Sequence, residues 1–170
     1  MNIFFLHRLA PLAASAHCDK HVGKMLIESC QLLATAHHEL GNGHAVTYKP
    51  THANHPCAIW VRQSRLHYDY VLDLAIYLAR EFYRRYGKVH KSYTVLCAEL
   101  KLPPPALLKN KMLWIDPPQA MPDEFKGPDA VAAYRSYYAS KSNVMAMVYY
   151  RGEQTMPHWL TDAQQQLEAV

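Results

Sequence analysis

A chain of 170 residues favours a single domain, and half of its residues are apolar while 19% are charged. This composition excludes a disordered tail and a charged coiled coil. Eleven histidines and twelve tyrosines stand against only six glycines, and the net charge is +4 with neutral histidines. Scarce glycine argues against a Gly-rich phosphate loop and against an architecture built from many tight turns.

The sequence shows no sign of a membrane or secreted protein. No apolar run approaches the roughly 20 residues that a membrane helix needs, and the N-terminus lacks the leading positive charge of a signal peptide. The four cysteines have no paired spacing, which favours reduced thiols. We therefore expect a cytoplasmic protein that is a monomer and has no membrane partner.

Hydrophobic periodicity predicts helices over most of the first half of the chain. The first runs from about Asp19 to Glu39, because apolar residues recur there at helical spacing and Gly41 follows as a stop signal. The second begins near Asn54 and continues to residue 86, and a shorter helix covers about 92–100.

The character of the chain changes over residues 103–128, the Pro-rich strap, which holds seven of the eleven prolines. Such a segment cannot form a regular helix or a central strand. We expect it to pack over the helices, pinned by Leu113 and Trp114, and not to link two domains. A last major helix covers about 129–140, and the chain ends in a short polar helix. The predicted fold is all-α: one compact domain over residues 1–170, with about three main helices and long irregular connections.

Positive charge concentrates in residues 80–111, the basic segment, which has eight Lys or Arg and two Glu. Its net charge is +6, so the rest of the chain sums to −2. Tyr83, Tyr86 and Tyr93 lie among these cations, and cations beside aromatic rings are typical of nucleic-acid binding. An ordinary solvated surface is the alternative. The partner that we expect is double-stranded DNA.

A row of polar residues at helical spacing, the polar stripe, follows one side of the first predicted helix. It consists of His17, His21, Lys24, Glu28, Gln31, Thr35 and His38. Such a row is either the solvent-facing side of an amphipathic helix or a catalytic wall. Neighbouring cations lower the pKa of lysines in general, which favours nucleophile or base chemistry. The candidate catalytic residues are Lys24, Glu28, His21, Asp19, Lys20 and His17.

The segment 50–57 leads into the second predicted helix. Asn54 is a good N-cap. Backbone amides point outward at a helix start, so a phosphate could dock beside His52 and Asn54, and Arg62 and Arg65 would continue that anion site. The candidate DNA-contacting residues are His52, Asn54, His55, Arg62, Arg65, Arg84, Arg85, Lys88, Lys91 and Trp159.

Zinc binding is the rival use of so many histidines. Cys18 and His21, together with His52, His55 and Cys57, would supply enough ligands for one ion. Their spacing matches no zinc module, so we predict neither a metal site nor a cofactor. Walker, Rossmann and nucleophile-elbow motifs are absent from the sequence as well.

Four stretches of the sequence resemble one family. They are Leu12-Ala13 with His17 and the helix after it, Pro50-Thr51 with the helix through Tyr70 and Leu74 to Arg84, Met121–Gly127, and Pro157-His158-Trp159. They resemble the small phage pyrimidine-dimer DNA glycosylases with abasic-site lyase activity, of the endonuclease V type. The resemblance implies a compact all-α domain of a phage-infected or bacterial cell that binds duplex DNA, kinks it and extrudes a base.

Two positions depart from the pattern of that family. The family uses the α-amine of an N-terminal Thr as its nucleophile, whereas position 2 here is Asn2, which we expect to keep the initiator methionine in place. Counting from His17 places Lys24 where the family has its catalytic Glu, with Glu28 one turn later. Either Lys24 or Lys20 is a substitute amine with Glu28 assisting, or the fold serves different chemistry.

Three hypotheses follow for the function. In the first, the protein is a DNA glycosylase and abasic-site lyase, in which Lys24 forms a Schiff base with C1′ and Glu28 or His21 moves protons. In the second, it is a phage enzyme of thymine hypermodification that transfers an amine or amino acid to activated 5-hydroxymethyluracil in DNA. In the third, it binds DNA without catalysis and the polar stripe is plain surface.

Overall fold

The computed structural model describes residues 1–151 and 155–162, and within these ranges every regular element is a helix or a helical turn. The all-α prediction is confirmed. The three main helices are α2 (Asp19–Glu39), α4 (Arg65–Tyr86) and α7 (Ala130–Ala139). The bounds of α2 are those predicted from its periodicity. None of the helices in the described ranges is both long enough and apolar enough to cross a membrane.

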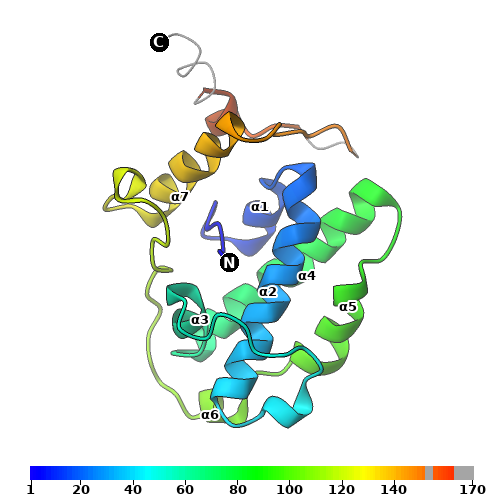
Figure 1. Cartoon of the computed structure of the whole chain (residues 1–170), viewed down its shortest axis with the longest axis vertical. Coiled ribbons are helices and arrows are strands. Elements are labelled where there is room, and N and C mark those ends of the chain that lie inside the picture. The colour runs from blue at the N-terminus through cyan, green and yellow to red at the C-terminus, as the bar shows by residue number, and fades with distance from the viewer. Residues whose placement is uncertain (152–154, 163–170) are drawn as a thin grey trace.

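The core forms where α2 and α4 lie antiparallel and side by side (Figure 1). Val22 and Leu33 of α2 and Leu74 and Leu78 of α4 are fully buried. Residues at such spacings share one face of a helix, so each helix presents an apolar side to the other. The short α1 (Ala10–Ser15) packs against α4, while α7 lies on the far side of the N-terminal segment (Figure 1).

The helix predicted over residues 54–86 is in fact two helices, α3 (Pro56–Val61) and α4. The side-chain oxygen of Ser64 accepts a hydrogen bond from the backbone N–H of Leu66 at 3.2 Å, and this cap begins α4 anew. At the other end, α4 stops at Gly87, whose φ of 65° few other residues adopt. The break turns α3 away from the axis of α4.

A histidine caps the start of α3. Nδ1 of His55 accepts a hydrogen bond from the backbone N–H of Cys57 at 3.2 Å, so the N-cap is His55 and not the predicted Asn54. The remaining helical elements are short: α5 (Lys91–Val95), which continues as a π-helical turn (Leu96–Leu100), α6 (Pro105–Leu108), and 3-10 turns at Gly43–Ala45, Asp123–Phe125 and Ser140–Asn143.

The Pro-rich strap runs along the outside of the helices, and Trp114 holds it there. The Trp114 ring packs edge-on against Trp60 at 5.5 Å, and the indole N–H of Trp60 donates to the carbonyl of Ile115 at 3.1 Å. Leu113 was predicted to help pin the strap, but it is 79% exposed. In an extended chain successive side chains point to opposite sides, so Trp114 faces inward and Leu113 faces solvent.

The N-terminal segment, residues 2–6, is a buried extended stretch between α2 and α7 that the sequence analysis did not identify (Figure 1). Ile3 and Phe5 are fully buried. Phe4 has a φ of 48°, a strained value for a bulky residue. The Asn2 side-chain oxygen holds this turn, because it accepts hydrogen bonds from the N–H groups of Ile3 and Phe4 at 2.8 and 3.0 Å.

Candidate functional site

Most of the polar stripe is covered by other segments, and Lys24 is its exposed member. His17, His21 and Thr35 are buried, and Glu28 is half-buried. The N-terminal segment covers the first half of the stripe, and the loop before α3 covers the second half. In that second half, the Thr35 hydroxyl bonds both the N–H and the carbonyl of Thr51, at 3.1 and 3.2 Å. The stripe is therefore an internal seam between α2 and two covering segments.

The carboxylate of Glu28 lies at the centre of this seam and faces two amines. Its Oε2 accepts a hydrogen bond from the backbone N–H of Asn2 at 2.8 Å and lies 3.9 Å from the α-amino group of Met1. Its Oε1 lies 3.9 Å from Nζ of Lys24, one turn earlier on α2. The Lys24 side chain is 60% exposed and that of Glu28 17%. A mobile amine at the surface therefore reaches a carboxylate that the fold holds in place.

His21 is held one turn from Lys24 by buried partners. Its Nδ1 lies 2.9 Å from the Tyr138 hydroxyl of α7, and that hydroxyl accepts a hydrogen bond from the backbone N–H of Cys18. The Phe4 ring stacks on the imidazole at 5.6 Å between centroids. When the Tyr138 hydroxyl donates to Nδ1, the imidazole carries its proton on Nε2.

The electrostatic environment keeps His21 neutral. Burial, together with the positive charges of Lys24, Lys20 and Lys141, lowers its pKa to about 4. At neutral pH the imidazole can donate or accept a hydrogen bond, but an imidazolium acid is not available there.

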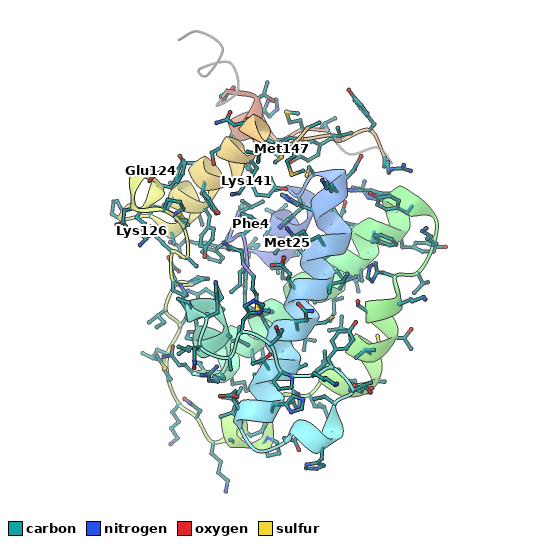
Figure 2. All side chains as sticks on the ribbon, in the orientation of Figure 1. Phe4, Met25, Glu124, Lys126, Lys141 and Met147 are labelled. Atoms are coloured by element: carbon teal, nitrogen blue, oxygen red, sulfur yellow. The ribbon has the colours of Figure 1, made fainter. Side chains whose placement is uncertain are left out.

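Figure 2 shows Phe4 and Met25 close together beneath α7, with Lys141 above them at the end of that helix.

Two other predicted catalytic residues belong to the structural framework. His17 is fully buried, its Nδ1 lies 2.7 Å from the carbonyl of Ala13, and burial lowers its pKa to about 3. Asp19 is buried and accepts hydrogen bonds from the backbone N–H groups of Tyr150 and Arg151 at 3.0 and 3.2 Å. Neither is open to a substrate. Lys20, the sixth candidate, is exposed on the first turn of α2.

Arg85 was predicted to contact DNA, and the structure contradicts that role. Its side chain is fully buried, with Nη1 3.1 Å from Asp19 and Nη2 2.9 Å from Glu81. It also donates to the backbone carbonyls of His17 and Ser15. The last turn of α4 packs against the start of α2 there, so the guanidinium bonds protein groups and cannot reach a phosphate.

The remaining predicted cations do not form one surface. Arg62 donates to the carbonyl of Ala53 at 2.6 Å and thus fastens the loop before α3. Arg65 pairs with Asp69 near the start of α4, whereas Arg84 pairs with Glu81 near its end. At 1.5 Å per residue these two arginines lie about 30 Å apart along the helix axis. Lys88 and Lys91, just after α4, are exposed.

The loop before α3 does reach the Glu28 site. Burial lowers the pKa of His55, the positive α-amino group lowers it further, and Glu28 raises it, which places the imidazole within electrostatic reach of both groups. His52 has a φ of 51° and its Nδ1 lies 2.6 Å from the Thr51 hydroxyl. His52 and Asn54 are exposed beside His55. Two predicted regions, α2 and this loop, therefore meet.

Several residues of the site carried no signal in the sequence. Asn2 and Phe4 belong to a segment without helical periodicity, and the Lys141 ammonium lies 3.8 Å from the Tyr137 ring centroid on the far side of the site. Trp159, predicted to contact DNA, is half-buried beneath the guanidinium of Arg135 at 5.2 Å. Trp159 and Arg135 are far apart in the chain, as are Asn2 and Glu28, and only the fold brings these pairs together.

Neither a metal cluster nor a known relative identifies the site. Within residues 1–151 and 155–162, no group of three or more His, Cys, Asp or Glu side chains could hold a metal ion. No protein family, curated protein or solved structure matches the chain.

Proposed function

We propose that the protein is a DNA-acting enzyme of the glycosylase and abasic-site lyase type, which processes an extruded pyrimidine nucleotide. The observation that carries this proposal is the Glu28 carboxylate, half-buried and 3.9 Å from the exposed Lys24 amine. An amine nucleophile beside a fixed carboxylate is the arrangement that Schiff-base chemistry at a sugar carbon requires. The exposed Lys20 supplies positive charge for a phosphate beside the site.

The Lys24 amine and the Glu28 carboxylate can carry out this reaction without a cofactor. The Lys24 nitrogen forms a bond to C1′ while the glycosidic bond breaks and the base leaves with its electron pair. Glu28 accepts the proton that the attacking amine releases and returns it to O4′ as the C1′–O4′ bond breaks and the sugar ring opens to give the Schiff base. His21, with its pKa lowered to about 4, takes part as a neutral hydrogen-bonding group and not as the acid.

Borohydride trapping tests this proposal. Reduction in the presence of duplex DNA with one abasic site should join the protein covalently to the DNA. We expect Lys24→Ala to abolish the adduct and Lys20→Ala, a substitution at another exposed lysine one turn away, to preserve it. Absence of any adduct with wild-type protein contradicts the lyase function. Full trapping by Lys24→Ala contradicts the role of Lys24.

A second function is favoured by one observation, the three lysines around neutral His21. Lys20, Lys24 and Lys141 form a cationic cluster that suits a leaving pyrophosphate. Such a cluster fits the transfer of an amine to activated 5-hydroxymethyluracil in DNA. In that case treated DNA contains a new base by mass spectrometry, its strands stay intact, and borohydride traps no adduct.

A further inference from the structure

A cavity lies in the basic segment, on the part of α4 that faces α5. Its volume is about 200 Å³, and it is lined by Ala79, Arg80, Tyr83, Val89, His90 and Tyr93. Figure 1 shows α5 folded back beside the second half of α4, and these two helices and the turn between them form the walls. The cavity is distinct from the Glu28 site, which is built from α2, the N-terminal segment and the loop before α3.

The walls of the cavity offer aromatic surface to a ligand. Tyr83 is 59% exposed and Tyr93 36% exposed, although large apolar rings are usually covered. Neither ring stacks on another aromatic ring of the described chain. Pockets for drug-sized molecules begin at roughly 300 Å³, so this smaller cavity suits a single heteroaromatic ring.

His90 contributes a neutral imidazole of fixed orientation to the lining of the cavity. Its Nδ1 accepts a hydrogen bond from the backbone N–H of Ser92 at 3.1 Å, so the neutral imidazole carries its proton on Nε2. Burial lowers the pKa of His90, which keeps that form at neutral pH. The Phe82 ring meets the imidazole edge-on at 4.7 Å and fixes its orientation.

Positive charge surrounds the cavity. Arg80 lines it, with its guanidinium 4.8 Å from the Tyr77 ring centroid and no ion pair among the described residues. Lys88 in the turn after α4 and Lys91 at the start of α5 are exposed beside the cavity. An apolar slot for a ring, a donor for a ring oxygen or nitrogen, and cations for a phosphate are the features that recognise a nucleotide.

We propose that this cavity binds one nucleotide, with its base beside Tyr83 and Tyr93 and its phosphate beside Arg80 and Lys91. The base comes either from an unpaired position of a DNA strand or from a free nucleotide. The first source rests on the proposed function, because only a DNA-binding protein would meet that strand.

Two measurements test this inference on the full chain. Fluorescence anisotropy measures the affinity for a short oligothymidylate. Carbamidomethylation of Cys97, followed by mass spectrometry, reports on the edge of the cavity, because Cys97 is exposed one turn after the lining residue Tyr93, whereas the other three cysteines are buried. The variants are Tyr83→Ala and Tyr93→Ala, with Tyr83→Phe as the conservative form. Tyr150→Ala, at an 89% exposed tyrosine outside the cavity, is the matched control.

The expected result is that oligothymidylate slows the modification of Cys97 and that each alanine variant loses about tenfold in affinity, since stacking on one aromatic side chain contributes about 1–3 kcal/mol per base. Tyr83→Phe and Tyr150→Ala should bind as the wild type does. Unchanged affinity in both alanine variants, while the wild type binds DNA, overturns the inference and leaves the proposed function standing.

If the protein binds no DNA at all, the proposed function is contradicted. Protection of Cys97 by thymidine monophosphate then tests whether the cavity binds a nucleotide. Protection of Cys97 by thymidine monophosphate, lost in Tyr93→Ala, supports a site for free nucleotides. Absence of that protection overturns the inference.

Discussion

At the scale of single residues, buried charges join the end of α4 to the start of α2 and to the backbone after α7. Arg85 joins the last turn of α4 to Asp19 at the start of α2, and Asp19 in turn binds the backbone after α7. A fully buried guanidinium is stable only while its partners remain, because an isolated buried charge has lost its hydration without compensation. Arg85, one of the predicted DNA contacts, is therefore a structural group.

We expect Arg85→Ala to lower the free energy of unfolding by about 3–5 kcal/mol, since it leaves the carboxylates of Asp19 and Glu81 without their buried partner. Arg84→Ala is the matched control: its side chain is 42% exposed, and an exposed pair contributes less than about 1 kcal/mol. Urea denaturation of the two variants measures the difference. Equal losses would contradict the structural role of Arg85.

The buried imidazoles predict how stability depends on pH. The pKa of His17 is lowered to about 3 and that of His21 to about 4, from an ordinary value of 6.5. Between pH 6.5 and pH 4 the unfolded chain therefore binds more protons than the folded one, and stability is lost as the pH falls through this window. Each imidazole can contribute up to about 2 kcal/mol between pH 6.5 and 4.5.

Urea unfolding at pH 7 and at pH 4.5 measures this loss. We expect His17→Leu to reduce the difference between the two pH values and His44→Leu, at an exposed position, to leave it unchanged. A wild-type protein that is equally stable at both pH values would show that these imidazoles are not held neutral.

At the scale of elements, capping residues decide where the helices begin and end. The periodicity of α2 is uninterrupted from Asp19 to Glu39, so its bounds were predictable. The apolar pattern also continues from α3 into α4, although the structure breaks the helix there and Ser64 caps the start of α4. A cap acts through one hydrogen bond to the backbone, which hydrophobic spacing does not report.

The end of α4 yields a prediction with a close control. Gly87 has a φ of 65°, so Gly87→Ala should lower stability by about 1 kcal/mol through backbone strain alone, because no atom lies within 4 Å of the added methyl group. Gly127→Ala adds a methyl group to equally open space without a positive φ and should be neutral or stabilising. Thermal unfolding compares the two, and equal melting temperatures would contradict the role of Gly87.

At the scale of the whole molecule, the candidate site arises where segments distant in sequence meet. The sequence identified Lys24, Glu28 and the loop before α3, because their residue types suit chemistry or anion binding. The partial burial of the polar stripe was not predictable, since neither the N-terminal segment nor the loop before α3, which cover it, has a helical period. Nor does any local pattern place Asn2 against Glu28.

The proposed binding of DNA is also tested on the whole molecule. Neutralising about five phosphates gives a slope near −4.5 for the logarithm of the binding constant against the logarithm of salt concentration. The double variant Lys88→Gln, Lys91→Gln should reduce this slope by about 2. Changing Lys109 and Lys111 to Gln, in the strap just after α6, is the control that should leave it unchanged. Binding by titration at several salt concentrations measures the slope, and a flat dependence contradicts DNA binding.

The most direct test of the central claim, an amine–carboxylate centre at Lys24 and Glu28, is to map the nitrogen that bonds to DNA. Protein trapped with borohydride on abasic-site duplex is digested, and the peptide that carries the sugar remnant is sequenced by mass spectrometry. The account predicts the added mass on Nζ of Lys24 and a slower formation of the adduct in Glu28→Gln. Added mass on any other nitrogen, the α-amino group of Met1 included, would contradict it.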